Sequence, residues 1–298
     1  MVIIKSERQL DKIKLQNLPL IGSGRTAFVY DMGDGKVLKL FRPSIPYESV
    51  VNELVRTQLA HSYGLPVPNA FDIVRSDSSY GILMEKIGGI GLEQEIIQHP
   101  EERLNLISRF AESVKATHQI SLSGSEMPDV RKESISICGR LDRTFCSADE
   151  AQKIRRVFER IPSADTFVHG DCHPGNAIDN DGIIHFFDLT FAGKGHPVFD
   201  LLCMYSHYVF LPSFITEEEY VSKNGMTKDE AGALDHRFLE SYYPESKASE
   251  ISQIKEQIRG VHAARICLST VMMPGVFTDE ILQEAKNRAI RFSESFLL

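Results

Sequence analysis

The first 85 residues alternate short apolar runs with glycine-rich or polar breaks, a pattern typical of strands and turns. Residues 18–41 read LPLIGSGRTAFVYDMGDGKVLKLF, and the breaks at Gly-Ser-Gly and Gly-Asp-Gly predict a strand, a glycine-rich turn and two strands joined by a hairpin. The spacing of Val50 and Leu54 then predicts a helix that stops near Gly64, and residues 72–86 predict another antiparallel pair. We therefore expect a small, strand-rich lobe with one main helix.

The pattern becomes helical after the glycine-rich stretch at residues 88–91. Residues 93–120 and 148–161 have helical periodicity, and the first of them has an apolar face made of Leu104, Ile107, Phe110, Ala111 and Val114. From residue 236 onward the sequence predicts helix, with one possible strand at 266–272, whereas residues 121–147 have no clear pattern. The expected fold class is α+β with two lobes, a small antiparallel-sheet lobe at 1–87 and a larger, mostly helical lobe at 88–298.

Composition narrows the classes of partner. The formal net charge is −8, which argues against binding to nucleic acid or to an anionic membrane surface. The five cysteines have no CxxC pairing, which is typical of free thiols in a reducing compartment. The N-terminal residues lack a signal-peptide pattern, and the apolar run DLLCMYSHYVF is too short to span a bilayer. We therefore expect a soluble, cytoplasmic protein that binds neither nucleic acid nor membrane.

The Gly22-Ser23-Gly24 segment is the first candidate for chemistry. Two glycines between strands let main-chain amides approach a polyphosphate that a Cβ atom would obstruct. No helix is predicted directly after the segment, so it fits neither a dinucleotide-binding fingerprint nor a Walker loop. A glycine-rich hairpin that binds nothing has the same pattern, so the segment alone leaves both readings open.

Lys39 is the second candidate, and it lies between Leu38 and Leu40 on a predicted strand. Because side chains alternate along a strand, the lysine should point to the face opposite these leucines. Glu53 follows on the next predicted helix, and such a glutamate can hold a lysine on phosphate oxygens. Glu48 is expected to precede that helix, and a solvent-exposed lysine is the alternative for Lys39.

The loop VHGDCHPGN at 168–176 and the later Asp188 form the third candidate. An aspartate on a rigid turn can accept a hydroxyl proton, which makes Asp171 the candidate base. Asn176 can offer an amide oxygen to Mg²⁺, and Asp188, at the end of the apolar run IIHFF, can offer a carboxylate oxygen to the same ion.

These motifs together resemble the aminoglycoside phosphotransferase and choline kinase-like family, whose fold is protein kinase-like. The pattern His-Gly-Asp-x-x-x-x-Asn followed by an aspartate is the most specific part of the resemblance. Supporting parts are GSGRTAFVY, Lys39, Glu53, ILMEKIGG, the helix ending at His118, and HPVFDLL with Asp200. The resemblance spans residues 20 to about 205 in the family's order.

The resemblance implies an ATP- and Mg²⁺-dependent kinase that phosphorylates a hydroxyl of a small molecule. It assigns Asp171 as the catalytic base, Asn176 and Asp188 as Mg²⁺ ligands, and residues 1–87 as the nucleotide-binding lobe. The remaining residues that it implies for ATP binding are Gly22, Ser23, Gly24, Lys39 with Glu53, Met84 beside the adenine, and the main chain of Glu85 and Ile87. It leaves His169 and His173 with roles in holding the loop.

Departures from protein kinases favour a small acceptor over a peptide. Gly170 stands where regulated protein kinases have arginine, Leu189-Thr190 follows Asp188 in place of Phe-Gly, and no Ala-Pro-Glu segment is present. Ala27 stands at the third glycine position of the loop. An aminoglycoside, an amino alcohol or a sugar would fit as acceptor, and the negative net charge slightly favours a cationic acceptor.

Two alternatives remain open from the sequence. One is a metal-dependent hydrolase that uses His169, Asp171 and His173 as an H-x-D-x-H set, although this would leave Lys39 and Glu53 unexplained. The other is a nucleotide-binding regulatory module without turnover. The identity of the acceptor and the oligomeric state are not predicted.

Overall fold

The computed structural model describes residues 6–141 and 143–295. The start of the N-terminal segment, which lacks a signal-peptide pattern, therefore lies outside the described residues. The chain packs into two compact units. Unit 1 comprises Met1–Gln94 and Pro174–Phe191, and unit 2 comprises Glu95–His173 and Ala192–Leu298. Unit 1 therefore takes a segment from the second half of the chain, and the lobe boundary at residue 87 stays a prediction.

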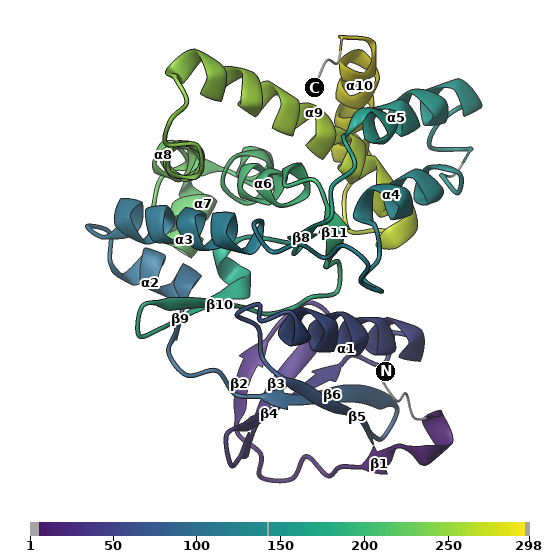
Figure 1. Ribbon diagram of the computed structural model, residues 1–298, viewed down its shortest axis with the longest axis vertical. Coiled ribbons are helices and arrows are strands. Elements are labelled where there is room, and N and C mark those ends of the chain that lie inside the picture. The colour runs from purple at the N-terminus through teal and green to yellow at the C-terminus, as the bar shows by residue number, and fades with distance from the viewer. Residues whose placement is uncertain (1–5, 142, 296–298) are drawn as a thin grey trace. The chain divides into compact units, whose positions relative to one another are not determined.

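Unit 1 contains a six-stranded sheet with the order β1-β5-β6-β4-β3-β2 (Figure 1). Neighbouring strands are antiparallel except β1 and β5, which are parallel, so the sheet is mixed where the sequence predicted an antiparallel one. The strands are β1 (Asp11–Lys12), β2 (Leu20–Ser23), β3 (Ala27–Gly33), β4 (Lys36–Phe41), β5 (Ala70–Ser76) and β6 (Ser79–Glu85).

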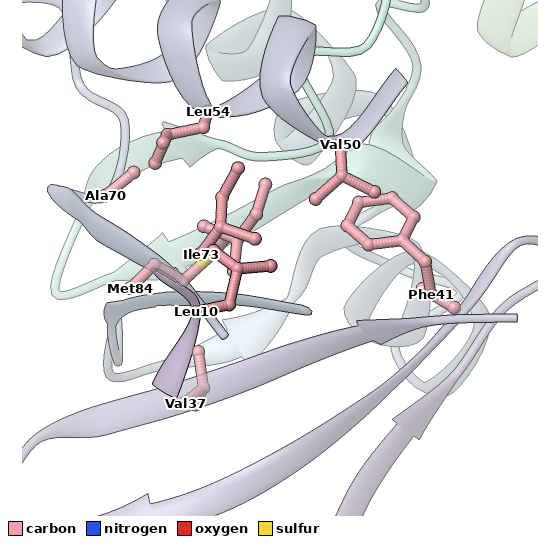
Figure 2. Packing of buried hydrophobic residues seen from close by; sticks show 10 residues of the cluster. Leu10, Val37, Phe41, Val50, Leu54, Ala70, Ile73 and Met84 are labelled. Atoms are coloured by element: carbon pink, nitrogen blue, oxygen red, sulfur yellow. The ribbon is translucent and has the colours of Figure 1, made fainter. Parts of the chain in front are cut away.

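One face of this sheet is covered by α1 (Tyr47–Ser62) (Figure 1). Figure 2 shows Val50 and Leu54 of the helix packed toward sheet residues such as Ile73 and Phe41 in one buried cluster. Each fully buried aliphatic or aromatic side chain of this kind contributes about 1.5–3 kcal/mol. Leu38 and its neighbours pack in a separate cluster, as expected from alternation along β4.

A second, three-stranded sheet of unit 1 is formed by β7 (Ile90–Gly91), β9 (Ala177–Asn180) and β10 (Ile183–Phe186), in the order β10-β9-β7. The approach of this sheet's strands accounts for one glycine of the glycine-rich stretch at residues 88–91. Gly89 has φ +98°, and a Cβ atom there would lie 2.0 Å from the main-chain oxygen of Asp179. Only glycine fits this close approach between two main-chain segments.

Unit 2 is mostly helical and also has a two-stranded sheet of β8 (Thr166–Val168) and β11 (Gly193–Gly195). Its longest helix, α9, lies beside α10, and the absence of a side chain at Gly260 leaves room for the ring of Phe292. α2 (Leu92–Gln98) runs from one unit into the other in sequence. The other helices are α3 (Arg103–Thr117), α4 (Val130–Cys138), α5 (Ala148–Arg160), α6 (Val198–Tyr205), α7 (Glu217–Asn224), α8 (Lys228–Tyr242), α9 (Ala248–Met272) and α10 (Asp279–Ser295).

Three expectations about helices need correction. Leu104 is 45% exposed, so the buried face of α3 is carried by Ile107, Phe110 and their neighbours without it. Residues 266–272 are the last turns of α9 and not a strand, and their apolar character reflects burial of this end of the helix in unit 2. Glu48 lies inside the first turn of α1 and not before it. Among the described residues, no helix combines the length and apolar character needed to cross a bilayer.

Candidate active site

Four polar side chains of unit 1 form a closed ring. Lys39 Nζ lies 2.6 Å from Glu53 Oε1 and 3.1 Å from Asp188 Oδ1. Thr190 Oγ1 lies 2.8 Å from Glu53 Oε2 and 2.8 Å from the same Asp188 oxygen. β4 supplies the lysine, α1 the glutamate, and the segment after β10 the other two residues. The expectation that Lys39 points away from Leu38 toward the helix is therefore confirmed.

Burial and charge act against each other in this ring. Burial alone would lower the pKa of Lys39, but the carboxylates of Glu53 and Asp188 outweigh it, and the pKa is raised. Burial raises the pKa of Glu53, and the Asp188 charge adds to that rise, although Lys39 lowers it. The Lys39 ammonium is thus paired with the two carboxylates of Glu53 and Asp188. The ring therefore has an excess of negative charge that a bound cation would offset.

Asp188 follows β10 by two residues and has φ +63°, a left-handed conformation that aspartate tolerates better than most residues. The N–H of Phe187 donates to the main-chain oxygen of Asn176 at 3.0 Å. This bond places Asn176, at the end of the 3-10 turn Pro174–Asn176, beside the segment that carries Asp188. A carboxylate and an amide oxygen on adjacent segments are ligands of the kind that Mg²⁺ takes, together with water and phosphate oxygens.

The glycine-rich segment forms the turn between β2 and β3. Gly22 pairs with Val29, and the Gly24 N–H donates to Ala27 O at 2.8 Å. A cation outside the motifs holds the turn, since Arg42 donates to the main-chain oxygens of Gly24 and Arg25 at 3.0 and 2.7 Å. The Ser23 main chain ends β2 at the edge of this turn.

Met84 and Glu85 lie at the end of β6. The Met84 side chain belongs to the core cluster under α1. The Glu85 N–H donates to Asn69 O at 2.8 Å, so this amide is used inside the unit. Ile87 follows β6 directly and precedes the close approach at Gly89.

In unit 2, the main chain before Asp171 is held by a buried carboxylate. Asp200, in the first turn of α6, accepts the N–H of His169 at 2.8 Å and the N–H of Gly170 at 2.6 Å. Burial raises the pKa of Asp200, but hydrogen bonds from His118 and the main chain outweigh this and lower it. Gly170 has φ +78°, which accounts for a glycine here. Arg265 of α9 also donates to the Gly170 oxygen.

His118, at the end of α3, links this carboxylate to α8. Its Nε2 lies 2.9 Å from Asp200 Oδ2, and its Nδ1 lies 2.7 Å from the Tyr242 hydroxyl. Because an ionised carboxylate only accepts, Nε2 must carry a hydrogen, and burial raises the pKa of the Tyr242 hydroxyl that bonds to Nδ1. The chain Tyr242–His118–Asp200 therefore fixes the loop.

Asp171 follows this fixed main chain. Its side chain is 46% exposed, and its N–H donates to His169 Nδ1 at 3.2 Å. Its Oδ2 lies 3.8 Å from Nε2 of His173, whose ring stacks on His207 with centroids 4.5 Å apart. A half-exposed carboxylate on a rigid turn has the setting of a general base.

The structure thus gathers Lys39, Glu53 and Asp188 in unit 1, with Asn176 on the adjacent segment, and holds Asp171 in unit 2. Within residues 6–141 and 143–295, no three or more His, Cys, Asp and Glu side chains are grouped so as to hold a metal ion. His169 and His173 instead make the contacts of a braced loop. Tyr242 and Arg265 lie far from the motifs in sequence, and no spacing pattern could have indicated them.

Known proteins resemble this chain over most of its length. Residues 17–227 match the model of the phosphotransferase enzyme family. Human choline/ethanolamine kinase is 24% identical over 264 residues, which cover 77% of this chain and 66% of that protein. The chain therefore spans about two thirds of the length of this relative.

Two solved structures show the same fold at low identity. The aminoglycoside phosphotransferase APH(2'')-Ib bound to ADP has a TM-score of 0.56 at 16% identity, with 96% of each chain covered. A choline/ethanolamine kinase family protein from Mesorhizobium loti has a TM-score of 0.53 at 14% identity, with 93% of this chain and 87% of that chain covered.

The fold is the one that these phosphotransferase and kinase structures share, and the predicted fold class is confirmed. The chain belongs to the phosphotransferase enzyme family. The resemblance drawn from the sequence is confirmed with it, and the family agrees with the expected class of enzyme, a phosphotransferase.

Proposed function

We propose that this chain transfers the γ-phosphoryl group of ATP, with Mg²⁺, to a hydroxyl of a small molecule. The observation that carries the proposal is the position of Lys39 Nζ, within 3.1 Å of both Glu53 and Asp188. A lysine held by a helix glutamate beside a metal-binding aspartate is the arrangement that kinases use to position phosphates. An ADP complex and an ATP complex among the similar structures support nucleotide use.

The residues present fit a bound magnesium ion. Asp188 supplies one charged oxygen and Asn176 one amide oxygen from the adjacent segment, and Mg²⁺ commonly takes few protein ligands when phosphates supply the rest. The bound ion would neutralise charge on the phosphate oxygens during transfer. The excess negative charge of the Lys39 ring fits a nearby cation.

The chain's own residues divide the work of the reaction. Lys39 would release Asp188 in part and bind phosphate oxygens, while Glu53 keeps its ammonium in place. The glycine-rich turn at Gly22, Ser23 and Gly24 would lie over the phosphates. Met84 would border the adenine, with the Glu85 carbonyl and the Ile87 N–H as the hydrogen-bonding groups, because the Glu85 N–H already donates to Asn69.

Asp171 would orient the acceptor hydroxyl and accept its proton. The main chain before it is held by Asp200, so the carboxylate needs little reorganisation when the hydroxyl arrives. His173 would keep a positioning role beside Asp171, since its ring is engaged with His207. The contacts of His169 support a bracing role and not that of a hydrolase ligand.

The acceptor is a small alcohol of a class still to be assigned by experiment. One similar structure is a gentamicin complex of an aminoglycoside phosphotransferase, and the human relative is a choline/ethanolamine kinase. The test is ADP release in the presence of aminoglycosides, amino alcohols and sugars, each with and without Mg²⁺. Acceptor-stimulated, Mg²⁺-dependent ADP release supports the proposal, and nucleotide binding without turnover on any acceptor favours a regulatory module.

A further inference from the structure

The hydroxyl of Thr190 occupies a position in the ring that the motifs do not assign. Its Oγ1 lies 2.8 Å from Glu53 Oε2 and 2.8 Å from Asp188 Oδ1. The residue two positions after the metal-binding aspartate is glycine in the Asp-Phe-Gly motif of protein kinases, and glycine could make neither contact. Thr190 therefore adds a link between the helix glutamate and the metal-binding aspartate that is separate from Lys39.

The two contacts compete for one hydrogen. A threonine hydroxyl has one O–H donor, whereas an ionised carboxylate has only acceptors. Thr190 can thus donate to Glu53 or to Asp188 at one moment, while Lys39 contacts both carboxylates. A cation bound to Asp188 would remove this competition, because Thr190 could then donate fully to Glu53.

Glu53 needs this second donor. The residue is 1% exposed, and its two oxygens have different partners, Lys39 at Oε1 and Thr190 at Oε2. Because Lys39 stays with Oε1 when its ammonium binds phosphate oxygens, Oε2 depends on Thr190, and a buried carboxylate without this hydroxyl would lose its partner at that oxygen.

We propose that Thr190 is a positioning residue of the Mg-nucleotide site, whose hydroxyl is shared between Asp188 and Glu53 in the free chain and keeps Glu53 paired when metal binds Asp188. This inference rests on the proposed function, because it assumes that Asp188 and Lys39 serve a metal–nucleotide complex. It adds a determinant of Mg²⁺ dependence that lies outside the residues expected to touch metal or nucleotide.

The test compares three variants. Thr190→Val keeps the shape and removes the hydroxyl, and Thr190→Ser keeps the hydroxyl. Thr57→Val is the matched control, because Thr57 is also buried in unit 1 and its hydroxyl binds the main-chain oxygen of Glu53, not the carboxylate. The readout is calorimetric affinity for the imido analogue of ATP, or of GTP if the wild type prefers it, with Mg²⁺ and with EDTA.

We expect Thr190→Val to weaken binding about tenfold with Mg²⁺ and to leave binding in EDTA within about twofold. Thr190→Ser and Thr57→Val should both retain the wild-type gain from Mg²⁺. If Mg²⁺ raises the nucleotide affinity of the wild type and raises that of Thr190→Val as much, the role of Thr190 is overturned and the proposed function stands. A wild type whose nucleotide affinity does not respond to Mg²⁺ overturns the proposed function, and the role of Thr190 falls with it.

Discussion

Lys39 and Glu53 form a buried ion pair, with Nζ 2.6 Å from Oε1 and both side chains at most a tenth exposed. Removing one partner of such a pair leaves the other charge buried, which costs about 3 kcal/mol or more, whereas an apolar replacement of both is often near neutral. The pair therefore allows its structural contribution to be separated from its function by a double-mutant cycle.

We predict that Lys39→Met lowers the free energy of unfolding by about 3 kcal/mol and that Lys39→Met with Glu53→Leu lowers it by less than the sum of the single changes. Nucleotide affinity should fall in both, because the phosphate-binding ammonium is absent from both. Chemical unfolding and calorimetry measure the two quantities. Additive stability effects would contradict the ion pair, and wild-type nucleotide affinity in the double variant would contradict the phosphate-binding role.

Asp188 offers a second test, with a control matched in main-chain conformation. Asp188→Ala should abolish most of the gain in nucleotide affinity that Mg²⁺ gives, because it removes the charged oxygen of the proposed metal site. Asp181→Ala changes another aspartate with positive φ, 51° against 63°, in the β9–β10 turn, so both variants carry the same kind of main-chain cost. A Mg²⁺ response that survives in Asp188→Ala would show that the ion binds elsewhere.

The glycine-rich stretch after β6 should respond unequally to substitution. Gly89→Ala should lower the free energy of unfolding by at least about 2 kcal/mol, because a Cβ atom would overlap the Asp179 oxygen in a left-handed conformation. Gly91→Ala is the control, since a Cβ atom there meets nothing within 4 Å. Urea unfolding checks both variants, and equal losses of stability would contradict the close approach of β7 and β9.

Acid should destabilise unit 2 through a buried histidine. Burial lowers the pKa of His262 to about 3, helped by the charges of Arg265 and Arg288, and its ring packs against Tyr205 and Phe210. The folded state disfavours its protonation, so stability is complete above about pH 6.5 and falls as the pH drops below that value toward 3.

The free energy of unfolding should therefore fall by about 2 kcal/mol between about pH 7.5 and about pH 5 because of His262 alone. Urea unfolding at the two pH values measures the loss. His262→Gln should reduce this difference, whatever its effect at neutral pH, whereas His236→Gln on the exposed surface of α8 should leave it unchanged. An unchanged difference in His262→Gln would show that the imidazole is not held neutral.

The sequence predicted the local parts of the fold well because those parts are local in origin. Alternation in β4 indicated where Lys39 points, and helical spacing indicated α1 and its partner Glu53. Leu104 was misplaced because periodicity shows that a face exists but not where its edge falls. Residues 266–272 were ambiguous because a buried helix end and a short apolar strand have similar composition.

The supports of the candidate site could not be predicted in the same way. Arg265 reaches the loop of Asp171 from α9, and Tyr242 supports it from α8 through His118, both more than 70 residues later in the chain than Asp171. Such contacts depend on tertiary packing, to which single-sequence patterns carry no direct signal. Thr190 was visible as a departure from a motif, but its two contacts required coordinates.

Asp171 is the residue on which the proposed reaction depends most, as the base that accepts the acceptor's proton. The most direct measurement is turnover of Asp171→Asn on the first acceptor found by the ADP-release screen, with phosphorylated product detected by mass spectrometry and nucleotide affinity measured in parallel. The account predicts turnover at least about a hundredfold below wild type with nucleotide affinity unchanged, and wild-type turnover for Asp165→Asn, an exposed aspartate of the same unit. Product formation by Asp171→Asn at the wild-type rate would contradict it.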